Sequence, residues 1–183
     1  MSMETGTVPA RGVSKLGLYA YILAAVVLVL DQISKLWVLD VLDLPHKGQI
    51  AVMPIFRLTM VMNQGVSFGL LRADGPVGRW LLVGAALLVV TGLVIWVRKA
   101  DRALFATSLG LIIGGALGNN LIDRARIGEV VDFLDFSGLY FPWVFNVADS
   151  AITIGVVLLL LDSFSSGPHE PEAAAEETPA RDN

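Results

Sequence analysis

The sequence predicts an all-α membrane protein with four transmembrane helices, a small β-sheet outside the membrane and a short amphipathic helix. Three observations lead to this prediction. Hydrophobic residues make up 55% of the 183 residues and charged residues only 16%, a composition typical of membrane proteins. Four apolar stretches approach the length needed to cross a hydrocarbon core of about 30 Å. Between the first two stretches, one segment alternates apolar and polar residues as a half-buried strand does.

Composition also excludes several kinds of site. The formal charge of −4 comes from the segment 162–183, which holds six acids and one arginine. The remainder carries +1, so it gives no indication of nucleic-acid binding. The chain has no cysteine, and its two histidines, His46 and His169, lie far apart. We therefore expect no disulfide, no metal and no cofactor, and a disordered acidic tail over 162–183.

The first span is expected at about 16–39, after an N-terminal segment, 1–15. A secretory signal peptide is the alternative, because basic residues precede the apolar run. The run is longer than the core of a signal peptide, which is about 7 to 15 residues, and no small-x-small cleavage site ends it. Asp31 and Lys35 stand at positions i and i+4, where opposite charges meet on a helix. Spacing alone also allows a snorkelling pair at the membrane boundary.

The segment 40–78 contains no apolar run long enough to span a membrane. Within it, residues 55–63 alternate apolar and polar side chains, which predicts a strand, and we expect a small sheet over about 43–71. Asn63, Gln64 and Gly65 follow with the chemistry of a turn. On these residues alone, an ordinary turn is favoured over a functional one.

The second and third spans are expected at about 80–97 and 103–122. The tight cationic connection between them, 98–102, together with the basic residues of the N-terminal segment, places both on the cytoplasmic side. The third span carries glycines at helical spacings, which allow close helix contact in lipid: Gly110, Gly114, Gly115 and Gly118. It closes with polar residues that a plain helix terminus would also explain: Asn119, Asn120, Asp123, Arg124 and Arg126.

The last part of the chain contains two acids of interest. We expect about 126–142 to lie on the membrane surface as a short amphipathic helix, because acids alternate there with apolar residues. Asp132 lies in this segment. The fourth span follows at about 144–161, and Asp149 lies near its start. Four spans place both termini on the same, cytoplasmic, side.

An acid within a membrane span is by default a candidate functional residue. If Asp132 and Asp149 meet at a site of low dielectric constant, both cannot ionise easily, so the pair shares one proton. The ionised acid can then take a proton from water while the protonated acid donates to a carbonyl oxygen, which hydrolyses an amide. Alternatively, Asp132 is a solvated loop acid and Asp149 caps its helix or pairs, for instance with Arg124. Spacing alone leaves both alternatives open.

Five short blocks occur in order along the chain. They read DQISK at 31–35, NQGVSFG at 63–69, GGALGNNLIDR at 114–124, VVDF at 130–133 and FNVADSA at 145–151. With these blocks the chain resembles the lipoprotein signal peptidases (signal peptidase II), a family of bacterial aspartic intramembrane endopeptidases. Together the blocks cover nearly all of the range 16–161, which makes the resemblance specific, although any one block would be weak.

The resemblance implies cleavage of prolipoproteins before a diacylglyceryl-modified cysteine, at the periplasmic side of the bacterial cytoplasmic (inner) membrane. It implies that Asp132 and Asp149 are catalytic, that the sheet is periplasmic and that the segment 126–142 forms a lid. The remaining site residues that it implies bind substrate or support the pocket: Asp31, Lys35, Asn63, Gly65, Asn120, Arg124 and Asn146.

One feature departs from the family pattern, which has a single asparagine three residues before Asp-Arg. Here Gly118 is followed by two asparagines. The spacing to Arg124 selects Asn120, and Asn119 remains an alternative.

The resemblance also implies the partners. We expect prolipoproteins and membrane lipids, no nucleic acid, and a monomer. A transporter or channel with a charged relay is a second hypothesis, although the chain shows no internal repeat. A non-catalytic assembly factor, held together by the glycines of the third span, is a third. Replacing Asp149 by asparagine separates the three, because an assembly factor should tolerate the change.

Overall fold

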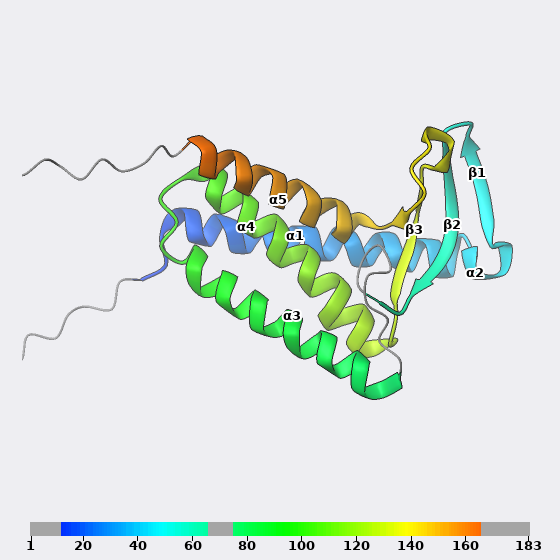
Figure 1. Ribbon diagram of the computed structural model, residues 1–183, viewed down its shortest axis with the longest axis horizontal. Coiled ribbons are helices and arrows are strands. Elements are labelled where there is room, and N and C mark those ends of the chain that lie inside the picture. Colours follow the sequence, from blue (N-terminus) through cyan, green and yellow to red (C-terminus); the bar gives the residue numbers. More distant parts are fainter. Residues whose placement is uncertain (1–11, 66–74, 166–183) are drawn as a thin grey trace, which may run out of the picture.

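The computed structural model describes residues 12–65 and 75–165. Four helices form a bundle, and a sheet stands across one end of it (Figure 1). All four helices are long and apolar enough to cross a membrane. The helices are α1 (Lys15–Leu36), α3 (Gly75–Val97), α4 (Ala103–Ala116) and α5 (Val147–Ser165). Two π-helical continuations, Trp37–Val41 and Leu117–Arg124, lengthen α1 and α4 toward the sheet.

The four predicted spans are confirmed, with shifted ends. Helix α3 begins at Gly75, five residues before the expected start. Helix α5 continues to Ser165, so residues 162–165 belong to a helix and not to the predicted tail. The reason is Asp162, which is buried and forms an ion pair with Arg102 at 2.8 Å. The rest of the predicted tail, 166–183, and the part of the predicted sheet over 66–71 lie outside the described residues.

Helix α4 is the centre of the bundle because its glycines admit two neighbours closely. A Cβ atom on Gly114 would lie 2.6 Å from the carbonyl oxygen of Ala24 in α1. A Cβ atom on Gly115 would lie 2.5 Å from that of Ala148 in α5. Packing of this kind replaces the hydrophobic drive between helices in lipid. Helix α3 lies further out, and its buried residues recur only every seventh position: Val83, Val90 and Val97.

The sheet has four antiparallel strands in the order β1-β2-β3-β4. They are β1 (Gln49–Met53), β2 (Phe56–Asn63), β3 (Val130–Asp135) and β4 (Val144–Phe145). The strand expected over 55–63 is confirmed by β2. A short helix, α2 (Leu44–Lys47), joins the end of α1 to β1.

The amphipathic helix expected over 126–142 is wrong, because this range contains β3 and one short 3₁₀ turn, Ser137–Leu139. Valine and phenylalanine favour strands, and β3 pairs with β2 on one side and β4 on the other. Residues 130–133 are all buried, so the segment does not lie on a membrane surface as an amphipathic helix would.

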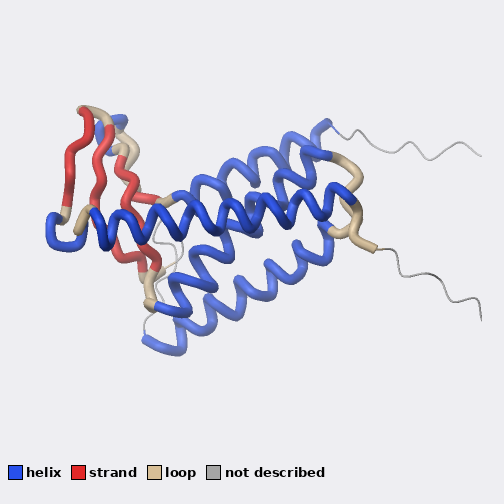
Figure 2. The backbone as a smooth tube through the Cα atoms, turned by 180° about the vertical axis from the view of Figure 1, so that it is seen from behind, coloured by secondary structure: helices blue, strands red, loops and turns tan. Residues whose placement is uncertain are grey.

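The sheet is fixed to the bundle through the end of α1. Val38 and Leu44 pack with Leu58 of β2 and with Val131 and Phe133 of β3 in one buried cluster. Figure 2 shows the same arrangement from behind, with the extended α1 running beside the strands. Val147, the first residue of α5, packs against the same cluster, so the start of α5 lies beside β3.

Candidate active site

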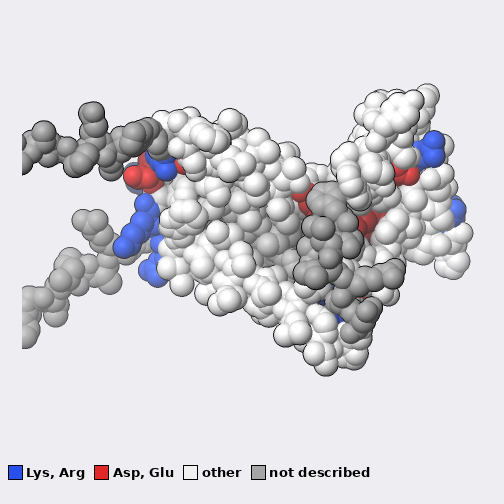
Figure 3. Space-filling model, viewed as in Figure 1, with Lys and Arg blue, Asp and Glu red and all other residues white. Residues whose placement is uncertain are grey.

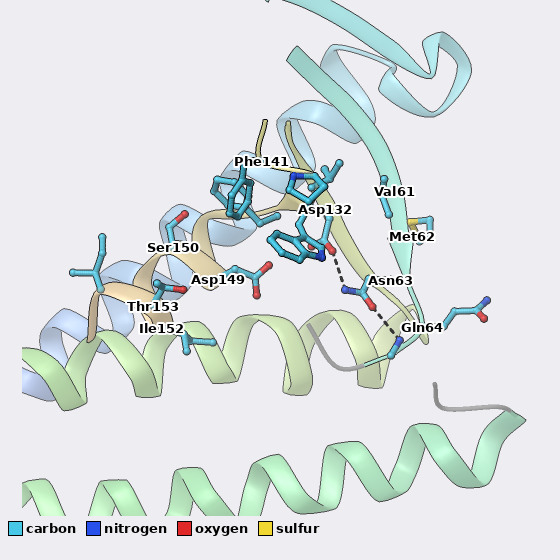
Figure 4. A pocket seen from close by; sticks show the side chains of 16 residues that line it. Val61, Met62, Asn63, Gln64, Asp132, Phe141, Asp149, Ser150, Ile152 and Thr153 are labelled. Carbon is cyan, nitrogen blue, oxygen red and sulfur yellow. Dashed lines mark hydrogen bonds between the residues drawn. The ribbon is translucent and has the colours of Figure 1, made fainter. Parts of the chain in front are cut away.

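A cavity of about 980 Å³ lies where the sheet meets the first turns of α5. Its wall includes the end of β2, Asp132 of β3, the segment 141–145 and Asp149 of α5. Figure 4 shows the side chains of Asp132 and Asp149 on this wall. The structure therefore brings together two acids that are 17 residues apart in the chain.

Asp132 is buried in the middle of β3, paired opposite Val61 of β2. One carboxylate oxygen accepts a hydrogen bond from the Asn63 amide at 3.0 Å, and the other accepts one from the Asn146 amide at 2.7 Å. Burial and then the charge of Asp149 raise the pKa of Asp132 to about 7, although the two amide donors act in the opposite direction. Asp132 is therefore not a solvated loop acid.

Asp149 is held by the start of its own helix. The Asn146 side-chain oxygen accepts from the Asp149 backbone N–H at 2.8 Å, and the Asp149 carboxylate accepts from the Asn146 backbone N–H at 3.3 Å. This reciprocal pair is a capping box. The other carboxylate oxygen accepts from the Asn119 amide at 2.8 Å. Asp149 therefore does cap its helix, as one alternative held. The other alternative, an ion pair with Arg124, does not occur among the described contacts.

Asn146 links the two acids. Its amide nitrogen donates to Asp132, while its backbone N–H and side-chain oxygen hold Asp149. The same amide nitrogen also reaches Asn119 at 3.1 Å. An acid that keeps its proton near neutral pH beside a second carboxylate can supply both a general acid and a general base.

Beneath the acids lies a buried ionic cluster centred on Lys35. Its ammonium group lies 2.8 Å from Asp31, 2.6 Å from Asp123 and 2.7 Å from the Asn119 side-chain oxygen. An ammonium group has three N–H donors, and each has an acceptor here. Lys35 is only 2% exposed, so it is not a snorkelling side chain at the membrane boundary.

The ionic cluster also positions the elements that carry the two acids. Asp31 accepts from the backbone N–H of Ala148, in the first turn of α5, at 2.9 Å. Asp123 accepts from the backbone N–H of Val131, in β3, at 3.2 Å. Each carboxylate thus joins the buried cation to the backbone next to one of the two acids.

Arg124 donates its hydrogen bonds to the turn after β2, and its charge also interacts with that of Asp132. Its guanidinium donates to the carbonyl oxygens of Gln64 at 3.1 Å and Gly65 at 2.6 Å. The Asn63 side-chain oxygen accepts from the Gly65 backbone N–H at 3.0 Å. The turn is therefore ordinary in form, but it sets the direction in which Asn63 donates to Asp132.

The spacing argument that selected Asn120 is corrected by the structure. The Asn120 amide donates to the Ala116 carbonyl oxygen of its own helix at 3.2 Å, whereas Asn119 contacts Lys35, Asn146 and Asp149. The cause is the π-helical form of 117–124. A π-turn accommodates one extra residue in a helix, so Asn119 faces the site although it stands five residues before Arg124.

Asp123 was absent from the predicted site, and Asn119 was present only as the alternative to Asn120. Gln32 adds a further contact, donating to Asp123 at 2.8 Å. An acid at the end of an apolar span needs a cationic partner, and this signal could have identified Asp123. Within the ranges 12–65 and 75–165, no group of three or more His, Cys, Asp or Glu residues is arranged to hold a metal ion.

Most of the chain matches one protein family. Residues 23–165 match the family model described as signal peptidase (SPase) II. The lipoprotein signal peptidase of Caulobacter vibrioides is 58% identical over 158 residues, which are 86% of this chain and 94% of that protein. The lipoprotein signal peptidase of Methylorubrum extorquens is 48% identical over 145 residues, 79% of this chain and 84% of that protein.

Two solved structures, each described as a bacterial membrane enzyme, share the fold. One superposes with a TM-score of 0.71 at 25% identity, over 91% of this chain and 99% of its own. The other superposes with a TM-score of 0.69 at 28% identity, over 86% of this chain and 99% of its own. The helix bundle with a sheet at one end is therefore an arrangement that this chain shares with known membrane enzymes.

Proposed function

The chain belongs to the signal peptidase II family of proteases, and on that premise we propose that it cleaves prolipoproteins before a diacylglyceryl-modified cysteine, with Asp132 and Asp149 as its catalytic pair. One observation carries this proposal. The two acids come from separate elements, lie on the wall of one cavity and are bridged by Asn146.

In the resting enzyme the pair holds one proton. We place it on Asp132, whose pKa is raised to about 7, because the start of α5 and the Asn146 backbone N–H favour the ionised form of Asp149. The Asp149 carboxylate takes a proton from water as the water oxygen attacks the carbon of the peptide bond. The Asp132 carboxyl group donates its proton to the carbonyl oxygen. When the tetrahedral intermediate collapses, Asp149 gives its proton to the leaving nitrogen and Asp132 recovers one from the hydroxyl group. The cycle consumes one water and leaves one proton on the pair.

The lining of the cavity supports a substrate with an apolar part. Beside the acids, the wall includes Phe141, Trp143, Ile152 and Ile154. The two isoleucines lie on α5, one of the four candidate spans, so this side of the cavity continues along a membrane helix. Acyl chains on the substrate cysteine would lie against this surface.

The orientation in the membrane follows from charge. The turn 98–102 lies at the end of the bundle opposite the cavity, and it carries Arg98, Lys99 and Arg102. Short cationic turns stay in the cytoplasm. The termini then lie on the cytoplasmic side, and the cavity lies near the periplasmic face of the inner membrane.

The test uses purified full-length protein in detergent and two synthetic prolipoprotein peptides, identical except that one carries a diacylglyceryl group on its cysteine. Mass spectrometry should find the lipidated peptide cut immediately before that cysteine and the other peptide intact. Cleavage of both peptides at equal rates would contradict the substrate class. Absence of cleavage, with ion or solute flux through liposomes containing the protein, would favour the transporter hypothesis instead.

A further inference from the structure

A second cavity, of about 450 Å³, lies at the end of the bundle opposite the sheet, between the end of α3 and the start of α4. We propose that it binds the headgroup phosphate of an anionic phospholipid. It is lined by two cations, one acid and three apolar or aromatic side chains: Lys99, Arg102, Asp101, Ile95, Trp96 and Phe105. None of these residues takes part in the site around Asp132 and Asp149.

In the proposed membrane orientation, this cavity lies at the depth of the lipid headgroups. Helix α3 ends at Val97 and α4 begins at Ala103, so the cavity opens where two apolar spans leave the hydrocarbon. Trp96 is 56% exposed at this level, and tryptophan favours the membrane–water interface. Basic pockets between transmembrane helices at this depth bind anionic headgroups.

The charge of the cavity suits an anion. Within the described part of the chain, the Lys99 ammonium group forms no ion pair and is exposed. Arg102 pairs with Asp162 at 2.8 Å, which holds its guanidinium in place. Asp101 lies 3.9 Å from Arg102, but its side chain is 88% exposed, so water screens it. Figure 3 shows Lys and Arg gathered at this end of the bundle.

Contacts within the protein hold two sides of the cavity in place. Ser14 fixes the turn that carries Lys99, because its backbone N–H donates to the Arg98 carbonyl oxygen at 2.9 Å and its hydroxyl donates to that of Ala100 at 2.8 Å. On the other side, Trp96 packs edge-on against Phe105, with ring centroids 4.9 Å apart. A preorganised site loses less entropy on binding than a mobile one.

The chain's own acidic tail is the competing occupant. Residues 166–183 include five acids, and their charge would also suit Lys99. A lipid fits better, because the cavity has an apolar side formed by Ile95 and Trp96 that continues along the exposed surface of α3. The tail has no leucine, isoleucine, valine, phenylalanine or methionine to cover that surface.

Native mass spectrometry of the full-length protein tests the proposal with phosphatidylglycerol and phosphatidylcholine of identical acyl chains. We expect phosphatidylglycerol to bind at least about fivefold more tightly than phosphatidylcholine. Lys99→Gln should weaken phosphatidylglycerol binding by about fivefold, since one cation near an anionic headgroup contributes about that much.

Lys47→Gln is the matched control. Lys47 is exposed in α2, on the sheet side, and in the described contacts its ammonium group donates only to the Leu42 carbonyl oxygen. We expect no change there.

Three outcomes would overturn the proposal. The first is equal binding of the two lipids by the unmodified protein, or equal effects of Lys99→Gln and Lys47→Gln. The second is displacement of phosphatidylglycerol by inorganic phosphate at equal concentration, which would identify a site for free anions. The third is a severalfold gain in phosphatidylglycerol binding when the five tail acids are neutralised, which would make the tail the occupant. The neutralised residues are Glu170, Glu172, Glu176, Glu177 and Asp182.

Discussion

The two ends of the helix bundle differ in how far their cations are buried. At the sheet end, Lys35 is buried and each of its donors has a buried acceptor. At the other end the cations of the turn 98–102 are exposed, and Arg102, whose side chain is 46% exposed, forms its ion pair with Asp162 partly in water. A buried charge is tolerated only with a complete set of partners. The sheet end is therefore a constrained unit, in which each residue depends on several others.

The largest expected effect tests whether the two acids at the sheet end catalyse cleavage. Asp132→Asn or Asp149→Asn removes the shared proton, and cleavage should fall by about 10⁴-fold or more, as when one member of a unit-acting catalytic group is lost. The rate is measured on the lipidated peptide.

Asp135→Asn is the control for these variants, because Asp135 lies on the same strand but accepts from Thr59 at 2.6 Å and from the Ser137 N–H at 2.8 Å. Burial alone would raise the pKa of Asp135, but these hydrogen bonds outweigh it and lower that pKa. This variant should keep most activity. Normal cleavage by Asp132→Asn would end the assignment.

The next effect compares the two ion pairs directly. Lys35→Met leaves Asp31 and Asp123 buried without their cation, which should lower the free energy of unfolding by about 3–5 kcal/mol. Asp162→Asn at the other end removes a buried carboxylate, but its cation, Arg102, is 46% exposed and stays hydrated when the pair is lost. We expect a smaller loss, of about 1–2 kcal/mol. Reversible unfolding in mixed detergent micelles measures both. Equal losses would show that the two ends do not differ as described.

Substitutions at two glycines, one at each end of the bundle, distinguish a loss of stability from a loss of activity. A Cβ atom on Gly118 would lie 2.6 Å from the Asp31 carboxylate, and one on Gly17, at the other end, 2.8 Å from the Val97 carbonyl oxygen. Either Gly→Ala change should cost about 1–3 kcal/mol of stability through overpacking. Only Gly118→Ala displaces the ionic cluster, so only it should lower kcat in protein that remains folded. A similar loss of kcat in Gly17→Ala would contradict the local role of the cluster.

The smallest effect concerns pH. Because the pKa of Asp132 is raised to about 7, the folded protein keeps this proton at lower pH and loses it as pH rises through 7. The pair then carries two negative charges, so activity should fall above pH 7. The unfolded chain loses the same proton near the ordinary pKa of 3.8. The stability contributed by this group is therefore full below that pH, falls as pH rises from about 4 to 7, and changes no further above 7.

Asn63→Ala removes a donor that lowers the pKa of Asp132, and the alkaline limb of the pH–rate profile should move to higher pH. Thr59→Val, which alters the surroundings of Asp135 instead, should leave the limb in place. A limb that moved to lower pH in Asn63→Ala would contradict the proton's location.

Local signals were sufficient for much of this fold. The length of the apolar runs predicted the four spans, and a period of two predicted β2. They failed for β3, because an alternation of acids and apolar residues over 130–135 suits a surface helix as well as a strand. Its pairing with β2 depends on residues about 70 positions away, such as Asn63 opposite Val130.

Only part of the candidate site could be predicted, because some of its residues stand in local motifs and others depend on contacts between distant segments. Asp132 and Asp149 stand in short motifs, so they could be named from the chain alone. Asn119 could not be chosen over Asn120, because the π-turn that rotates it toward the site appears only in the folded helix. Asp123 was missed because its cation, Lys35, comes from another helix.

The central claim is that Asp132 and Asp149 share one proton, and carboxyl-carbon NMR of full-length protein labelled at aspartate tests it most directly. The Asp132 signal is assigned by its absence in Asp132→Asn. We expect it to titrate near pH 7 in the unmodified protein and at lower pH in Asp149→Asn, where the neighbouring charge is removed. A signal that titrates at the ordinary value of 3.8, or whose midpoint does not respond to Asp149→Asn, would contradict the account.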